Sequence, residues 1–278
     1  MARPDRDLAG ALADPDPLLR RERWLIGLCL ALAAGLAWWW LLGQAADMRS
    51  AAAMAAMPGM AAAEPPRFWS YVPPAALMWS LMMVAMMLPS VTPMVLLYAR
   101  FAGQAAPRRG VLAPTTALAG AYLLVWGGFS AAAALAQFAL VKLGAVSATA
   151  LTLGDRRVAA ALLLAAGAYQ LSPAKDYCLK ACRAPLFFIM RLWRPGWRGA
   201  ARIGLHHGLH CLGCCWLVMA LLFVGGVMSL VWIAALAVLV LAEKVSPLGG
   251  WVARAAGVVA LTAGAALLAP GVVHWPAS

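Results

Sequence analysis

The sequence predicts an all-α protein, a polytopic transmembrane bundle of about seven helices. Of its 278 residues, 64% are hydrophobic and 12% are charged, and the mean hydropathy of +0.82 lies far above that of a soluble domain. Long apolar runs recur along the chain, and most approach the ~20 residues that cross a bilayer. A chain of this length has room for one membrane domain and none for a separate soluble catalytic domain.

Seven apolar runs define the predicted helices. In chain order they are residues 24–43, 75–98, 112–140, 158–171, 205–224, 227–241 and 251–270. The fourth run is short, so the count is six if it does not cross. Gly225 and Gly226 separate the fifth run from the sixth, because two glycines permit the tight connection needed between two crossings.

Four segments follow from these runs. Residues 1–23 mix acidic and basic side chains with two Asp-Pro pairs, which is typical of a disordered cytoplasmic tail. Residues 24–43 form an N-terminal transmembrane helix, for which a cleaved signal peptide is the alternative. Residues 44–74 are an outer linker, and residues 75–270 form a metal-binding transmembrane domain. The linker contains Met48, Met54, Met57 and Met60, which suit Cu(I) but are explained equally well by an Ala/Met-rich low-complexity linker.

The distribution of Lys and Arg predicts the orientation, because basic loops stay in the cytoplasm. Most of the 22 Lys and Arg fall in cytoplasmic segments if the N-terminus is inside, above all between residues 175 and 202. This predicts a multi-pass protein of a bacterial-type inner (cell) membrane. The net charge of +12 then reflects topology and contact with anionic membrane lipids, and does not indicate nucleic-acid binding.

Imidazoles and thiols are concentrated in one ten-residue stretch at the start of the fifth run. The donors are His206, His207, His210, Cys211, Cys214 and Cys215. On a helix all six would lie within about 180°, and the central four within about 100°. This pattern favours a site for a soft metal ion. The alternative is that the cysteines are small buried hydrophobic residues and the histidines lie at the membrane interface.

Two further groups of sulfur atoms extend the candidate site. Cys178 and Cys182 are four residues apart, so on a helical turn they face the same way and could complete a metal shell. The second apolar run contributes thioethers from Met82, Met83, Met86 and Met87. A methionine stripe also serves as adaptable packing material. Pro89 and Pro93 predict a break in that helix, of the kind that often marks a binding site.

Residues 178–244 resemble a known family. The strings CLKACRAPL and WRPGWRGAARIGLHHGLHCLGCCW, with the closing Glu243 and Lys244, are similar to a family of predicted metal-binding integral membrane proteins with a domain of unknown function, some members of which are labelled copper chaperones. The resemblance begins at MMVAMMLPS in the second apolar run. It implies roles for Cys178, Cys182, His207, Cys211, Cys214, Cys215 and Glu243. Ile203 and Ser229 depart from the family pattern.

Glu243 ends the sixth run, where a carboxylate is costly unless it is paired. Lys244 or an arginine of the basic segment is its expected partner, and an ion pair is favoured over a metal ligand. The ten Asp and Glu include no catalytic constellation, and there is no phosphate-binding loop. Whether the protein is an enzyme stays open, and a binding function is favoured.

These observations predict an integral membrane protein that binds a soft transition metal, with Cu(I) favoured and zinc as the second choice. It would take up the ion, store it or deliver it to a copper-receiving protein. Two alternatives stay open. One is a membrane redox enzyme that uses these thiols or a metal, and the other is a structural membrane subunit whose cluster staples helices through Zn(II).

Overall fold

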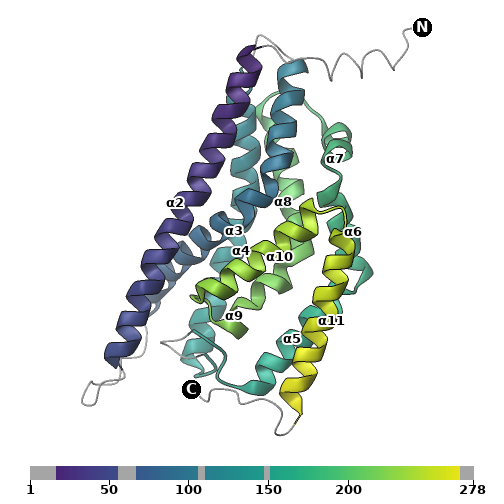
Figure 1. The fold of residues 1–278 in the computed structure, drawn as a ribbon. Helices are drawn as coiled ribbons and strands as arrows, with labels where there is room; N and C mark the ends of the chain where they lie inside the picture. The colour runs from purple at the N-terminus through teal and green to yellow at the C-terminus, as the bar shows by residue number, and fades with distance from the viewer. Residues whose placement is uncertain (1–16, 56–66, 106–109, 147–150, 270–278) are drawn as a thin grey trace.

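The computed structural model describes residues 17–55, 67–105, 110–146 and 151–269, and within these ranges it contains helices and no β-strand. The all-α prediction is therefore confirmed. Figure 1 shows the arrangement of the helices. Their bounds are α2 Pro17–Ala55, α3 Phe68–Ala105, α4 Leu112–Lys142, α5 Arg156–Gln170, α6 Pro173–Arg183, α7 Pro185–Leu192, α8 Trp197–Ala220, α9 Leu222–Gly225, α10 Leu230–Val245 and α11 Gly249–Leu268.

Every predicted apolar run falls largely within helix. In the described part of the chain, five helical segments are long and apolar enough to cross a membrane, namely Arg21–Met48, Phe68–Gln104, Leu112–Lys142, Trp197–Gly225 and Gly249–Leu268. The fourth and sixth runs correspond to α5 and α10, which have only 15 and 16 residues. The connection expected at Gly225 and Gly226 is present, because α9 ends there and Gly226 has a φ of +93°.

The helix α2 extends beyond both predicted ends. It begins at Pro17, inside the segment predicted to be a disordered tail, and continues to Ala55, inside the predicted linker. Alanine and methionine are good helix formers, so the Ala-rich start of that linker continues the helix. The next helix begins at Phe68. Of the linker methionines, Met48 is half-buried on α2, whereas the side chains of Met54, Met57 and Met60 lie outside the described residues.

The predicted break in the second apolar run does not occur, because α3 runs as one helix through Pro89 and Pro93. Pro89 has no N–H, so the carbonyl of Ala85 loses its helical donor. The indole of Trp38 on α2 donates to that carbonyl instead, at 3.2 Å. A side chain of the neighbouring helix thus offsets the lost hydrogen bond, and the helix continues.

The helices α4 and α8 pack against each other more extensively than any other pair of described helices. They approach closely at Gly204, where an added Cβ would lie only 2.1 Å from the carbonyl oxygen of Leu118. A second close pair joins α5 to α11 through Gly167 and Gly257. Glycine is needed at these positions because backbone atoms of the partner helix, or side-chain atoms packed on it, occupy the space of a side chain.

Gly204→Ala is expected to destabilise the protein by about 1–3 kcal/mol, because α8 must move away from α4 to admit the methyl group. Thermal unfolding in detergent would measure the change. Gly120→Ala on α4 is the matched control, since none of the described atoms lies within 4 Å of the added Cβ. The control should be neutral or stabilising by up to about 1 kcal/mol. Equal unfolding temperatures for the two variants would contradict the packing argument.

Candidate metal centre

The centre of the candidate site is a group of three thiols on α8. Cys211, Cys214 and Cys215 are each 0% exposed. The thiols of Cys214 and Cys215 donate to the carbonyl oxygen of Cys211, at 3.1 Å and 3.0 Å. The helical spacing brings all three side chains to the buried face of α8, as the sequence predicts.

The helix α6 adds a fourth thiol. Ser172 caps its N-terminus, because the Ser172 side chain accepts a hydrogen bond from the backbone N–H of Lys175. Cys182, the last residue but one of α6, is buried, and its thiol interacts with that of Cys214. The structure therefore brings the α6 turn and the α8 cluster together, and the role of this turn in a metal shell stays a prediction.

Cys178 lies at the edge of this cluster. It is half-buried, and its sulfur would be 2.9 Å from a Cβ added at Gly213. Partial burial and the neighbouring Cys214 raise the pKa of the Cys178 thiol. Gly213 therefore permits the contact between α6 and α8 that places both α6 cysteines beside the cluster.

Two polar side chains that were not assigned to the site from the sequence, Lys244 and Tyr122, contact Cys211. The ammonium of Lys244 on α10 donates to the sulfur of Cys211 at 2.8 Å and to the hydroxyl of Ser90 on α3 at 3.2 Å. The hydroxyl of Tyr122 on α4 lies 3.0 Å from the same sulfur. It also lies 3.5 Å from the carbonyl oxygen of Met87. Side chains of α4 and α10 thus meet at one thiol of α8, and α3 contacts both of those side chains.

The prediction that Glu243 pairs with Lys244 or with an arginine of the basic segment is wrong. Its carboxylate pairs with Lys175 on α6, at 2.6 Å, and both side chains are 1% exposed. Gln170 at the end of α5 donates to the other carboxylate oxygen at 2.8 Å, and the Lys175 ammonium also donates to the Gln170 amide oxygen. Glu243 is therefore part of a buried clamp between α5, α6 and α10, and Lys244 faces the thiols instead.

The predicted methionines are deeply buried on α3. Met82, Met83, Met86 and Met87 are all between 0% and 1% exposed. The contact of Met87 with Tyr122 is made by its backbone carbonyl and not by its thioether. These side chains form part of the core, and their role as copper ligands stays a prediction.

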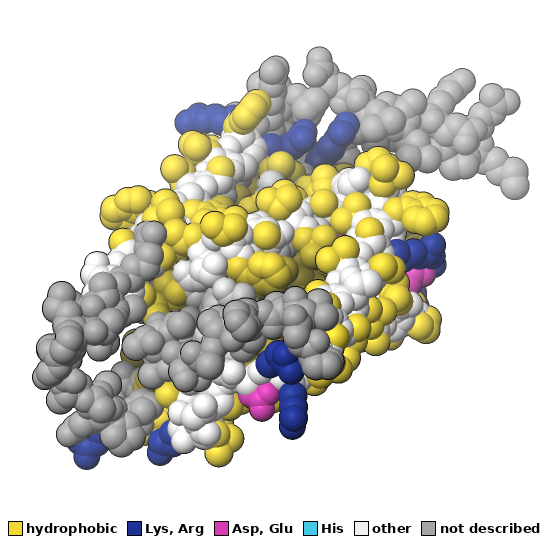
Figure 2. Space-filling model, turned by 60° about the horizontal axis from the view of Figure 1, so that its bottom comes forward, with side chains coloured by type: hydrophobic (Ala, Val, Ile, Leu, Met, Phe, Trp, Pro, Cys, Tyr) yellow, Lys and Arg dark blue, Asp and Glu magenta, His cyan; other side chains and the backbone are white. Residues whose placement is uncertain are grey.

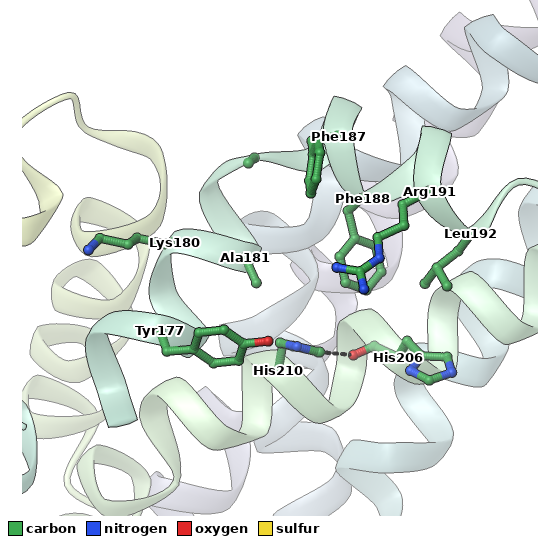
Figure 3. Close-up of a pocket in the computed structure, with 10 residues that line it drawn as sticks. Tyr177, Lys180, Ala181, Phe187, Phe188, Arg191, Leu192, His206 and His210 are labelled. Carbon is green, nitrogen blue, oxygen red and sulfur yellow. Dashed lines mark hydrogen bonds between the residues drawn. The ribbon is translucent and has the colours of Figure 1, made fainter. Parts of the chain in front are cut away.

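The histidines of α8 separate into two groups. His207 is 4% exposed, and its Nδ1 has no hydrogen-bond partner among the described residues. Its ring lies 5.9 Å from that of Tyr122 and 5.7 Å from that of Phe188. His206 and His210 instead line a cavity of about 560 Å³ between α6, α7 and α8, shown in Figure 3.

Within the described residues, no three His, Cys, Asp or Glu side chains are arranged as a ready-made metal site. The thiols instead make the hydrogen bonds described above. Thiols must lose their protons before they bind a metal, so binding here would exchange these hydrogen bonds for metal–sulfur bonds. The donor set fits a soft ion, because thiolate and thioether ligands select Cu(I) and imidazole also binds copper.

Comparison with known proteins supplies the family. A family model described as copper chaperone matches residues 76–267, from the first turns of α3 to the end of α11. No curated protein and no solved structure matches the chain. The matched region contains the four clustered cysteines, the three histidines of α8 and the α3 methionines, and it leaves out α2. The match covers well over half of the sequence, and the chain therefore belongs to the copper chaperone family.

Proposed function

We propose that this protein is an integral membrane copper chaperone that binds Cu(I) at the thiols of α8 and α6 and delivers it to a receiving protein. The observation that carries the proposal is the burial of Cys182, Cys211, Cys214 and Cys215 at one point between helices, in a chain of the copper chaperone family. Buried thiols hold a soft ion away from water and from competing ligands.

The surface supports a location in the membrane. Large apolar side chains lie exposed on the outer helices, among them Trp24, Leu36 and Trp39 on α2, which are 73%, 62% and 72% exposed. Figure 2 shows hydrophobic side chains over much of the described surface on the face it presents. Such an area would be costly in water and is suited to lipid. With the N-terminus in the cytoplasm of a bacterial-type cell, α6, α7 and the start of α8 lie at the inner side.

Cu(I) fits the cluster better than Zn(II) does. A structural zinc site needs a tetrahedral shell of four ligands, whereas Cu(I) is bound well by a pair of thiolates. The α3 methionines would supply weaker thioether sites through which the ion passes between the outer side and the thiols.

The test is metal analysis of the detergent-purified protein after anaerobic equilibration with Cu(I) and Zn(II) in competition. We expect near-stoichiometric copper in the wild type and none in the Cys211/Cys214/Cys215→Ser triple variant. Cys29→Ser is the matched control, because Cys29 is exposed on α2 outside the cluster, and it should retain copper. A wild type without metal would refute the proposal, and zinc bound in preference to copper would favour the structural staple.

A further inference from the structure

We propose that the cavity beside α7 is the port through which the thiol cluster exchanges Cu(I) with carriers on the side of α6 and α7, with His206 and His210 as transient ligands and Phe188 as the gate. The inference rests on the proposed function and adds a route and a control point to it. The cavity of about 560 Å³ is bounded by α6, α7 and α8.

His206 and His210 line the cavity, where their imidazole nitrogens can serve as copper ligands. They lie one turn apart on α8, and Figure 3 shows Tyr177 beside His210. The Nδ1 of His210 lies 2.8 Å from the backbone carbonyl of His206. A carbonyl oxygen only accepts, so Nδ1 carries the hydrogen and the lone pair of the neutral ring is on Nε2. A backbone carbonyl that orients an imidazole in this way is typical of metal-binding histidines.

Phe188 lines the cavity and also contacts the buried His207. It is buried, and its ring packs edge-on against His210 at 5.5 Å and against His207 at 5.7 Å. The ring of His207 in turn lies 5.9 Å from the ring of Tyr122, tilted by 34°, and the Tyr122 hydroxyl is 3.0 Å from the sulfur of Cys211. One aromatic ring therefore separates the ligands of the cavity from a buried histidine next to the thiols.

The buried nitrogen of His207 is a second observation that points to copper binding along this route. Its buried Nδ1 has no hydrogen-bond partner among the described residues, and an unpaired buried polar atom costs about 1–3 kcal/mol. In the tautomer that carries its hydrogen on Nε2, this Nδ1 has a free lone pair that a passing copper ion would use. His207 thus bridges the distance between the cavity and Cys211.

The charged side chains that line the cavity indicate in which form copper arrives. Arg191 and Lys180 line the cavity, and Lys180 is paired with Asp176. These three groups together carry one net positive charge, which disfavours a free copper ion. They favour an anionic carrier such as a Cu(I)–thiolate complex. In the exchange, a bond from copper to Nε2 forms as a carrier sulfur–copper bond breaks, and copper stays Cu(I). Each cysteine that finally binds copper loses its thiol proton, and a departing carrier thiolate takes that proton up, so that protons and charge balance.

The experiment measures the rate at which copper-loaded protein in detergent transfers Cu(I) to excess bathocuproine disulfonate, followed by the absorbance of the coloured complex. Phe188→Ala should release copper about tenfold faster, because the gate is removed. Phe188→Trp and the His206→Ala/His210→Ala double variant should release it about tenfold more slowly. The copper bound at equilibrium should be unchanged in all three.

Leu186→Ala is the matched control. Leu186 is on α7 and 42% exposed, and it does not line the cavity, so its release rate should equal that of the wild type. Wild-type rates in the Phe188 and histidine variants, with copper still bound at equilibrium, would overturn the port and leave the proposed function intact. Failure of the wild type to bind copper would refute the proposed function itself. Phe188→Trp keeps the test decisive if Phe188→Ala does not fold.

Discussion

Replacing Lys175 with methionine is expected to lower the free energy of unfolding by about 3–5 kcal/mol, because it leaves the Glu243 carboxylate buried without a counter-charge. The ammonium and the carboxylate are 2.6 Å apart and 1% exposed. The neighbouring Gln170 can satisfy one carboxylate oxygen but cannot neutralise the charge. Because the clamp joins α5, α6 and α10, its loss should also loosen α6, which positions Cys182.

Thermal or denaturant unfolding in detergent would measure this effect. The control is Lys180→Met on the same helix, whose ion pair with Asp176 is exposed at 75% and 47% and should contribute less than about 1 kcal/mol. The Lys175→Met/Glu243→Leu double variant should recover most of the lost stability, since it removes both charges. A Lys175→Met variant as stable as Lys180→Met would show that the clamp is not a buried ion pair in solution.

Replacing Lys244 with leucine is expected to weaken Cu(I) binding by about a hundredfold. Two thiolates and one Cu(I) form a complex with a net negative charge, which is costly in a buried site unless a cation is near. The Lys244 ammonium is 2.8 Å from the sulfur of Cys211 and supplies that cation. In the metal-free state the thiol can stay neutral, so removal of the lysine costs more when copper is bound.

Competition with a chromophoric Cu(I) chelator would measure the affinity. Lys244→Arg is the control, because it retains the positive charge beside Cys211, and it should bind copper within about tenfold of the wild type. Tighter binding by Lys244→Leu would mean that the ammonium competes with copper for the thiol, the opposite of the role assigned to it here.

The location of the helices and of the thiol face could be predicted from the sequence. Long apolar runs form helices whatever their neighbours are, and a periodicity of 3.6 residues places Cys211, Cys214 and Cys215 on one face. The same arc placed His206 at its edge and His210 among its central four donors. It could not show that His206 and His210 line a cavity instead of packing into the core. That boundary depends on where α6 and α7 lie against α8.

Helix composition, the apolar runs and the spacing of the sulfur and nitrogen donors were thus determined by the sequence itself, because they depend on local geometry. The partners of those donors were decided only by the tertiary structure. Glu243 and Lys244 are adjacent on α10, so their side chains diverge by about 100°. One meets Lys175 from α6, and the other meets Cys211 from α8. Such contacts join residues distant in sequence, and only the packing of several helices brings them together.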